Sequence, residues 1–377
     1  MSAGDVSLYV HVPFCASRCG YCDFNTYTAE ELGGGVRRDS FHEVLCSEID
    51  LAADSLGECR VTTVFVGGGT PTLLGSTGLN PIVQRIRDRF DVAPDAEITT
   101  EANPDSVSLQ MLEELRSGGF TRLSLGMQSA APAVLQVLER THTPGASRQA
   151  VVWARAAGFD HVNVDLIYGT PGESDDDLRT SLHEVLDAGV DHVSAYALIV
   201  EDGTALSRKV VRGDIPAPDD DVCADRYEII DATLSAAGMP WYELSNWAVR
   251  GAQCQHNIAY WTGANWWGIG PGAHSHVRGE RWWNVKHPAT YKQRLDDGTS
   301  PVAEREVLSS DQQYAESVML GIRLADGMAR CDISDVKAVN ELMLDGLLAT
   351  VTGNDERVAL TMRGRLLADT VTRALVP

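Results

Sequence analysis

Three cysteines lie close together near the N-terminus, at Cys15, Cys19 and Cys22. A short apolar run ends at Pro13 just before them, and proline cannot donate to a strand ladder, so the thiols follow a strand in a loop. An iron–sulfur cluster normally takes four cysteine thiolates, and the next cysteine here is Cys46. Three thiolates can hold three irons of a [4Fe–4S] cube and leave the fourth open. The spacing therefore predicts a cluster with one free coordination site.

Two other interpretations of these cysteines are open. A closed zinc site takes four ligands, often as two C-x2-C pairs, and the sequence has no second pair. Three unrelated cysteines, or a binding module without cluster chemistry, would leave the C-x3-C-x2-C spacing unexplained. The sequence favours the cluster over both.

Glycines and polar side chains recur further along the chain, each close after a short apolar run. Glycines let the backbone approach a ligand closely and expose its N–H groups. These residue types also have ordinary roles, since glycines make tight turns, arginines lie on helix surfaces and aspartates cap helices. With both interpretations open, the candidates are Gly68, Gly69, Thr70, Glu101, Gln128, Arg140 and Asp165.

The apolar runs before these residues alternate with longer amphipathic segments. This order predicts parallel strands joined by helical crossovers. Reactive groups follow nearly every strand, which is typical of a barrel whose strand ends surround one mouth and not of a doubly wound sheet. We predict an α/β fold, an incomplete (βα)6 barrel of TIM type. Its strands are expected at 8–12, 63–66, 97–101, 122–126, 161–165 and 192–197, and its helices at 41–56, 79–90, 109–117, 147–157 and 175–188.

The chain changes character near Pro216, where a proline- and aspartate-rich stretch precedes an aromatic tract. We expect residues 1–215 to form the partial barrel and residues 216–300 an aromatic-rich extension that completes its side. Residues 301–377 are expected to form a smaller C-terminal winged-helix-like α+β domain, with helices at 310–324 and 340–348 and a strand at 357–360.

The composition narrows the possible partners and location. A formal net charge of −22 argues against nucleic acid, whose binding rests on cationic contacts to phosphate, and against an anionic membrane surface. No run approaches the roughly 20 apolar residues needed to span a bilayer, and the N-terminus lacks an apolar signal region. We therefore expect a cytoplasmic protein, where thiols stay reduced.

Taken together, these motifs resemble the HemN/HemW branch of the radical S-adenosylmethionine (SAM) family over nearly the whole chain. The matching segments are 9–22, 67–72, 101–104, 126–128, 163–172 and 268–275. The resemblance implies a [4Fe–4S] cluster on Cys15, Cys19 and Cys22, with SAM on its open iron. The SAM contacts that it implies are Tyr9, Gly68, Gly69, Thr70, Glu101, Gln128, Arg140, Asp165 and Ala197.

The branch includes two activities of different class, a haem chaperone and an oxygen-independent coproporphyrinogen III oxidase, which decarboxylates porphyrinogen propionates by radical SAM chemistry. The oxidase pattern has a further cysteine two positions after the third ligand, where this chain has Phe24. The oxidase also carries an N-terminal extension, whereas this chain reaches Tyr9 almost at once. The resemblance therefore favours the chaperone, which would bind haem and transfer it to apo-haemoproteins such as respiratory cytochromes. The resemblance leaves open whether the chain is also an enzyme and whether it forms a homodimer.

One segment adds a positive signal for haem. Residues 255–261 read QHNIAYW and resemble the HNxxYW motif of the haem chaperones in this branch. Histidine is a common axial ligand of haem iron, so His256 is the expected haem ligand. Cys254 is an alternative thiolate ligand, and a structural histidine in an aromatic core is the ordinary interpretation of His256.

Overall fold

A computed structural model describes residues 4–32, 35–140 and 143–376 of the chain. Six parallel strands lie side by side in chain order. This arrangement confirms the predicted (βα)6 partial barrel. The strands are β1 (Gly4–Val12), β2 (Cys59–Gly68), β3 (Asp91–Ala102), β4 (Arg122–Gln128), β5 (His161–Tyr168) and β6 (His192–Ala197).

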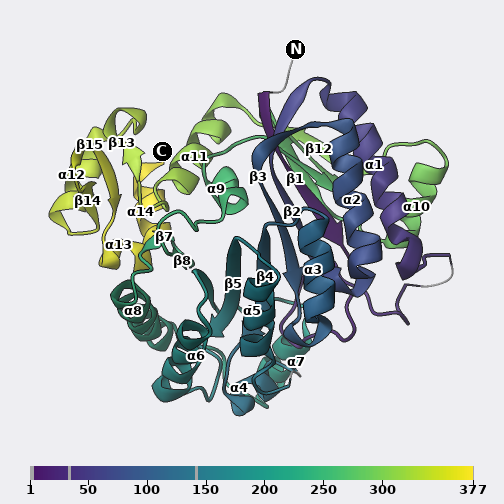
Figure 1. Cartoon of the computed structure of the whole chain (residues 1–377). Helices are drawn as coiled ribbons and strands as arrows, with labels where there is room; N and C mark the ends of the chain where they lie inside the picture. Colours follow the sequence, from purple (N-terminus) through teal and green to yellow (C-terminus); the bar gives the residue numbers. More distant parts are fainter. Residues whose placement is uncertain (1–3, 33–34, 141–142, 377) are drawn as a thin grey trace.

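Helices cover the outer face of these strands (Figure 1). Strand β1 illustrates how the two faces of the sheet differ, because its side chains point alternately into the apolar core and into the barrel. Leu8 and Val10 are fully buried in the apolar core, whereas Ser7 and Tyr9 point into the barrel. The covering helices are α1 (Phe41–Leu56), α2 (Gly75–Arg89), α3 (Leu109–Ser117), α4 (Pro132–Val137), α5 (Ala146–Ala156) and α6 (Asp175–Ala188).

The aromatic tract extends the sheet at both edges, giving twelve strands in all within the described residues. Strands β7 (Trp241–Glu243) and β8 (Asn246–Ala248) follow β6, and β8 is antiparallel to it. At the other edge β9 (Trp266–Ile269) runs parallel to β1 and leads to β10 (His274–Val277), β11 (Glu280–Asn284) and β12 (Val302–Val307). The remaining helices of this region are α7 (Ala205–Arg212), α8 (Asp220–Ala236), α9 (Gln255–Trp261) and α10 (Pro288–Asp296).

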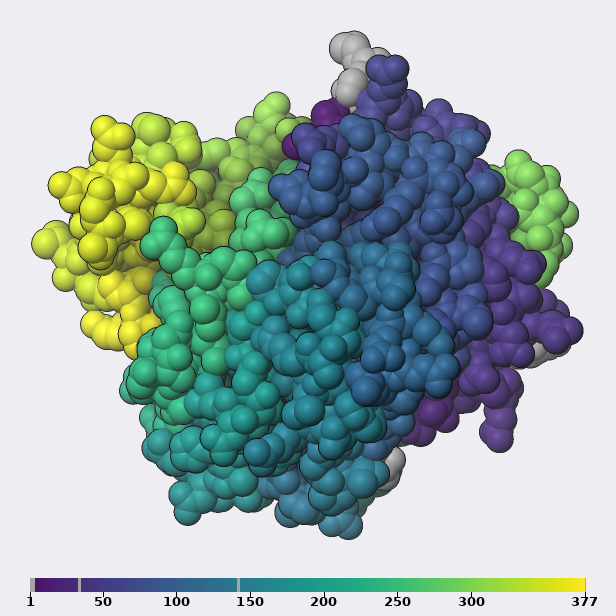
Figure 2. Space-filling model, viewed as in Figure 1, coloured from purple at the N-terminus to yellow at the C-terminus, as the bar shows by residue number. Residues whose placement is uncertain are grey.

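The C-terminal segment forms a lobe beside the barrel, drawn in yellow-green and yellow (Figures 1 and 2). It has its own apolar core and an antiparallel sheet in the order β13-β15-β14. The helix predicted at 340–348 instead spans Val336–Leu344, because Asp335 accepts a hydrogen bond from Ala338 N and caps an earlier start. The elements are α11 (Ser310–Gly321), β13 (Met328–Ala329), α12 (Val336–Leu344), β14 (Leu348–Val351), β15 (Asn354–Leu360), α13 (Met362–Leu366) and α14 (Ala368–Leu375).

Arg365 makes one of the contacts between this lobe and the barrel. Arg365 donates to both carboxylate oxygens of Asp231, at 2.7 and 3.0 Å, and its guanidinium lies over the Trp241 ring. Domain boundaries at 215 and 300 stay a prediction. No described helix has both the length and the apolarity needed to cross a membrane.

Candidate functional site

A cavity of about 890 Å³ opens at the carboxyl ends of the barrel strands and reaches through the barrel interior as far as Cys254 and His256. Every residue that the sequence analysis proposed as a ligand of the cluster, SAM or haem lines this cavity. They are Tyr9, Cys15, Cys19, Cys22, Gly68, Gly69, Thr70, Glu101, Gln128, Arg140, Asp165, Ala197, Cys254 and His256. The fold thus gathers side chains that lie more than two hundred positions apart in the sequence.

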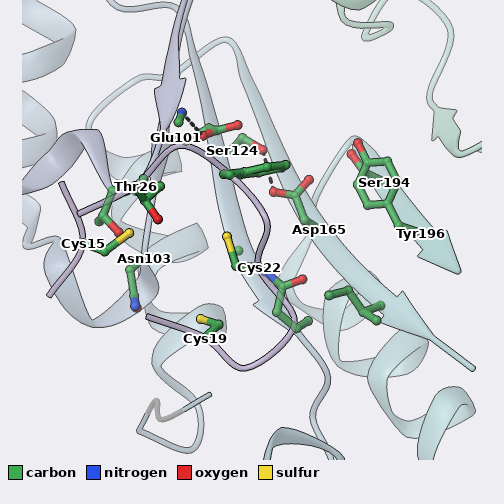
Figure 3. Close-up of a pocket in the computed structure, with 18 of the residues that line it drawn as sticks. Cys15, Cys19, Cys22, Thr26, Glu101, Asn103, Ser124, Asp165, Ser194 and Tyr196 are labelled. Carbon is green, nitrogen blue, oxygen red and sulfur yellow. Dashed lines mark hydrogen bonds between the residues drawn. The ribbon is translucent and has the colours of Figure 1, made fainter. Parts of the chain in front are cut away.

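The cysteine loop is fixed at its base by backbone hydrogen bonds. Cys15 N donates to Tyr27 O at 3.0 Å, and Tyr27 N donates to Pro13 O at 2.7 Å. The three sulfurs lie spread around the loop instead of converging on one point (Figure 3). Within the described residues, no three His, Cys, Asp or Glu side chains gather closely enough to hold a single metal ion. This spread fits a cluster, because each thiolate of a cube binds a different iron. A zinc ion would instead need every sulfur ligand within about 2.3 Å of the one metal.

Burial favours the neutral form of two of these thiols, Cys15 and Cys22, in the metal-free protein. Desolvation raises the pKa of Cys15, and it raises the pKa of Cys22 to about 11. Ligation requires the thiolate, so metal binding must displace these protons. The donor set therefore fits a group that carries enough positive charge to stabilise three partly buried thiolates.

The glycine-rich turn after β2 packs directly on the cysteine loop. Gly69 N donates to Val12 O at 2.9 Å, and Thr70 N donates to Phe14 O at 2.7 Å. A Cβ on Gly69 would lie 2.4 Å from Phe14 O and 3.0 Å from the Cys15 sulfur. Gly68 has a φ of +115°, which side chains rarely adopt. Only glycines allow this turn to approach Cys15 so closely.

Arg140 lies next to the cysteines, and one nitrogen of its guanidinium has no hydrogen-bond partner among the described residues. Its Nη1 donates to the Cys19 sulfur at 3.4 Å, and its Nη2 donates to Gly126 O at 2.7 Å. Its Nε is buried and, among the described residues, has no hydrogen-bond partner. A buried donor without a partner is costly, so this atom fits an anionic ligand such as a carboxylate beside the cluster.

Two carboxylates face the cavity from β3 and β5. Glu101 Oε2 accepts from Gly68 N at 3.0 Å, and burial with the nearby Asp165 raises the pKa of Glu101 to about 8. Asp165 accepts from Ser124 Oγ at 3.1 Å (Figure 3). It also accepts from Asn163 Nδ2 at 2.8 Å. Burial raises the pKa of Asp165 as well. Both groups are positioned to accept hydrogen bonds from ligand hydroxyls.

The backbone at the end of β4 is strained. Gln128 has a φ of +70°, which is uncommon for a residue with a side chain, and the pairing with β5 shifts register between Gly126 and Gln128. Such strain concentrates at functional sites. The bulge places Gln128 on the cavity wall. Ala197 ends β6 on the same wall, where Leu198 N donates to Tyr168 O at 2.8 Å.

Several cavity residues escaped the sequence analysis. Ser124, Asn163 and Ser194 lie on three neighbouring strands and form one hydrogen-bonded group behind Asp165. Asn163 alone had a signal in the sequence, because it stands two positions before the candidate Asp165 and alternate strand residues share a face. Other missed residues have exposed apolar side chains at the cavity, namely Tyr196 and Ile199.

The extension at the β1 edge supports the cysteine loop from behind. Asn25 Nδ2 donates to Pro271 O at 3.0 Å and to Lys286 O at 2.8 Å. The imidazole of His11 donates from Nε2 to Asn25 O at 2.9 Å, so its Nδ1 accepts from the Tyr9 hydroxyl at 3.0 Å. This network fixes the loop just after Cys22 and orients Tyr9 toward the cavity.

The haem candidates His256 and Cys254 lie at the opposite, amino end of the barrel interior. Thr63 Oγ1 donates to Ser7 Oγ, so His256 Nδ1 donates to Thr63 at 2.7 Å and His256 Nε2 accepts from the Tyr260 hydroxyl at 3.0 Å. His256 is only 2% exposed, and burial lowers its pKa to about 3. The Cys254 thiol donates to Glu97 Oε1 at 3.3 Å. Iron ligation by His256 would therefore require the Tyr260 contact to open.

Comparisons with known proteins agree with this site. A model of the Radical SAM superfamily matches residues 9–185. The chain is 54% identical over 371 residues to a protein of Mycobacterium tuberculosis named heme chaperone HemW, covering 98% of this chain and 94% of that one. It is 30% identical over 376 residues to the protein of the same name from Bacillus subtilis, covering 97% of each.

Among solved structures, coproporphyrinogen III oxidase (HemN) from Escherichia coli matches with a TM-score of 0.83. The match covers 98% of this chain and 90% of that chain at 24% sequence identity, and therefore concerns the fold alone. The sequence relatives cover nearly the full length of this chain, and they carry the assignment. The chain therefore belongs to the HemW family of radical SAM proteins.

Proposed function

We propose that this protein is a haem chaperone, which binds haem and transfers it to apo-haemoproteins such as respiratory cytochromes. The observation that carries the proposal is the 54% identity, over 98% of the chain, to a protein named heme chaperone HemW. The acidic surface, with a net charge of −22, is consistent with a soluble carrier in the cytoplasm. A homodimer is part of the same proposal.

We propose that the chain retains a radical SAM site and that this site regulates or stabilises the carrier. Cys15, Cys19 and Cys22 would hold the cluster, and Arg140 Nε would meet the SAM carboxylate. When bound, the pair supplies one-electron cleavage of SAM. The chain's own part is to hold the ligand: Glu101 accepts hydrogen bonds, and the tight turn at Gly69 closes over the loop.

The alternative function is the oxidative decarboxylation of coproporphyrinogen, the activity named for the HemN protein whose fold this chain shares. Phe24 lies at the cavity, 62% exposed, at the position where the oxidase pattern has its further cysteine. A phenyl ring cannot ligate iron or carry a thiol hydrogen, so this chain lacks one group of that pattern. We therefore rank the chaperone above the oxidase.

Two anaerobic assays on reconstituted full-length protein separate these functions. In the first, the haem-loaded protein is mixed with apomyoglobin as acceptor, and transfer is followed by the acceptor's absorption. In the second, the protein receives SAM, a reductant and coproporphyrinogen III, and protoporphyrinogen is measured. We expect haem transfer without decarboxylation. Steady protoporphyrinogen formation without haem transfer would overturn the proposal and establish the oxidase.

A further inference from the structure

The inward face of the barrel continues beyond the cavity onto the added strands. Trp266 on β9 pairs with Ser7 on β1, which points into the barrel, and also with His276 on β10. His274 lies two residues before His276 and so shares its face. Trp283 on β11 pairs with His274. The same inward surface that holds the cavity therefore presents His274 and Trp283 on the open side of the partial barrel.

His274 differs from His256 in its access to ligands. It is exposed, and its ring stacks on Trp283 with centroids 5.6 Å apart and planes at 24°. Within the described part of the chain, its ring nitrogens have no hydrogen-bond partner. Its neighbour His276 packs on Trp266 at 4.9 Å and has a buried Nδ1. Of the two histidines on this face, His274 is the one that a bulky ligand can reach.

The charges around His274 favour a neutral, metal-binding ring. Burial, followed by the positive charges of Lys286 and Arg281, lowers the pKa of His274. The neutral imidazole is the form that ligates metals. It is also the form in which the ring nitrogen can bond to iron without first losing a proton.

The surroundings also offer contacts for the rest of a haem. Trp283 is stacked on the imidazole, so a haem bound perpendicular to that imidazole would meet the apolar edge of the indole. Lys286 is exposed and has no ion-pair partner among the described residues, whereas Arg281 is paired with Glu306 at 3.5 Å and with Glu316. Glu304 and Glu306 lie on β12 opposite Trp283 and Arg281. Ligand carboxylates would therefore lie toward Lys286 and away from β12.

We propose that His274 is the imidazole that captures haem iron, with Trp283 supporting that ring and contacting the macrocycle by its edge, and Lys286 pairing with a propionate. This inference rests on the proposed function and names the residues that carry the cargo. Capture forms one iron–nitrogen bond and displaces an axial water, with no change in redox state. An open sheet face lets the cargo leave without movement of α9, which suits a protein that must release what it binds.

Haem titration of the full chain tests the assignment with four proteins: wild type, His274→Ala, His256→Ala and His183→Ala. His183 is an exposed histidine on α6 and serves as the matched control. We expect His274→Ala to weaken haem binding at least about tenfold and to lose the absorption spectrum of a histidine-ligated haem. Free imidazole should restore that spectrum. His256→Ala and His183→Ala should bind as the wild type does.

Other outcomes overturn the inference in distinguishable ways. Wild-type affinity in His274→Ala, with binding lost in His256→Ala, would place the ligand at His256 and leave the chaperone function standing. No haem binding by the wild type would remove the proposed function and this inference together. His274→Gln, which cannot ligate iron as an imidazole does, should reproduce the loss; a change in its thermal unfolding without a change in haem affinity would assign His274 a structural role.

Discussion

The two ends of the barrel interior differ in whether their polar groups are already paired. At the carboxyl end, Arg140 Nε is buried without a partner in the described structure, and Glu101 has a raised pKa. At the amino end, Glu97 accepts from Arg122, from Cys254 and from His256 N, and both ring nitrogens of His256 are bonded. One end is built to complete its contacts with ligands. The other completes most of its contacts within the protein and closes the barrel with α9, although the buried Nη1 of Arg122 has no hydrogen-bond partner among the described residues.

This difference changes how the conspicuous histidine of the sequence is understood. A carboxyl-end position in such barrels is typical of chemistry, and an amino-end position is typical of stability. His256 lies at the stabilising end, stacked on Phe65 with centroids 5.3 Å apart. The motif around His256 is consistent with a structural histidine that closes the amino end of the barrel as well as with a haem ligand. The following experiments separate the two roles.

Removal of a cluster ligand should have the largest effect. We expect Cys19→Ala to abolish the iron–sulfur absorbance and the bound iron and sulfide after anaerobic reconstitution, because two thiolates cannot retain a cube that normally takes four ligands. Cys331→Ala is the matched control, since this cysteine is exposed in the C-terminal lobe. Unchanged iron content in Cys19→Ala would contradict the assigned ligand set.

A break in the amino-end network should cost stability and spare the cluster. The Arg122–Glu97 pair is almost fully buried, at 1% and 8% side-chain exposure, with Nε and Oε2 2.9 Å apart. Arg122→Met leaves Glu97 charged and unpaired, so we expect a loss of about 3–5 kcal/mol in the free energy of unfolding. Urea denaturation measures it, and exposed Arg250→Met should stay within about 0.5 kcal/mol of wild type. Loss of the cluster from folded Arg122→Met would show that the two ends are not independent.

The raised pKa of Glu101 at the carboxyl end should make the stability of the ligand-free protein depend on pH. The folded pKa of Glu101, about 8, lies above the value of about 4.3 for an unfolded glutamate. The folded ligand-free protein therefore holds a proton that the unfolded chain releases, and its stability falls as pH rises from about 4.5 to 8. Glu101→Gln lacks this carboxyl, so over the same pH range its free energy of unfolding should fall by at least about 1.4 kcal/mol less than that of the wild type. Thermal or urea unfolding across this pH range measures the difference, and coincident curves would contradict the raised pKa.

The six-stranded core could be predicted because it rests on local signals. Each strand is an apolar run, and each candidate at its end is a residue type with limited uses. The added strands could not be predicted in the same way, since β7 and β8 have three residues each and β9 pairs with a strand more than 250 positions earlier. The placement of His256 depends on Thr63 and Tyr260 meeting it from two directions. No spacing in the sequence encodes that closure, nor does any spacing join His274 to Trp283.

The smallest change is the most direct test of the two histidines. Tyr260→Phe removes the hydroxyl that His256 Nε2 accepts from, at a cost of about 0.5–1.5 kcal/mol in stability. It also frees the nitrogen that would have to bind iron. If His256 carried haem, this variant should bind haem more tightly than wild type, because the competing hydrogen bond is gone. We expect unchanged haem affinity, because capture at His274 on β10 does not involve that nitrogen, and a tighter complex in Tyr260→Phe would move the ligand back to the barrel interior.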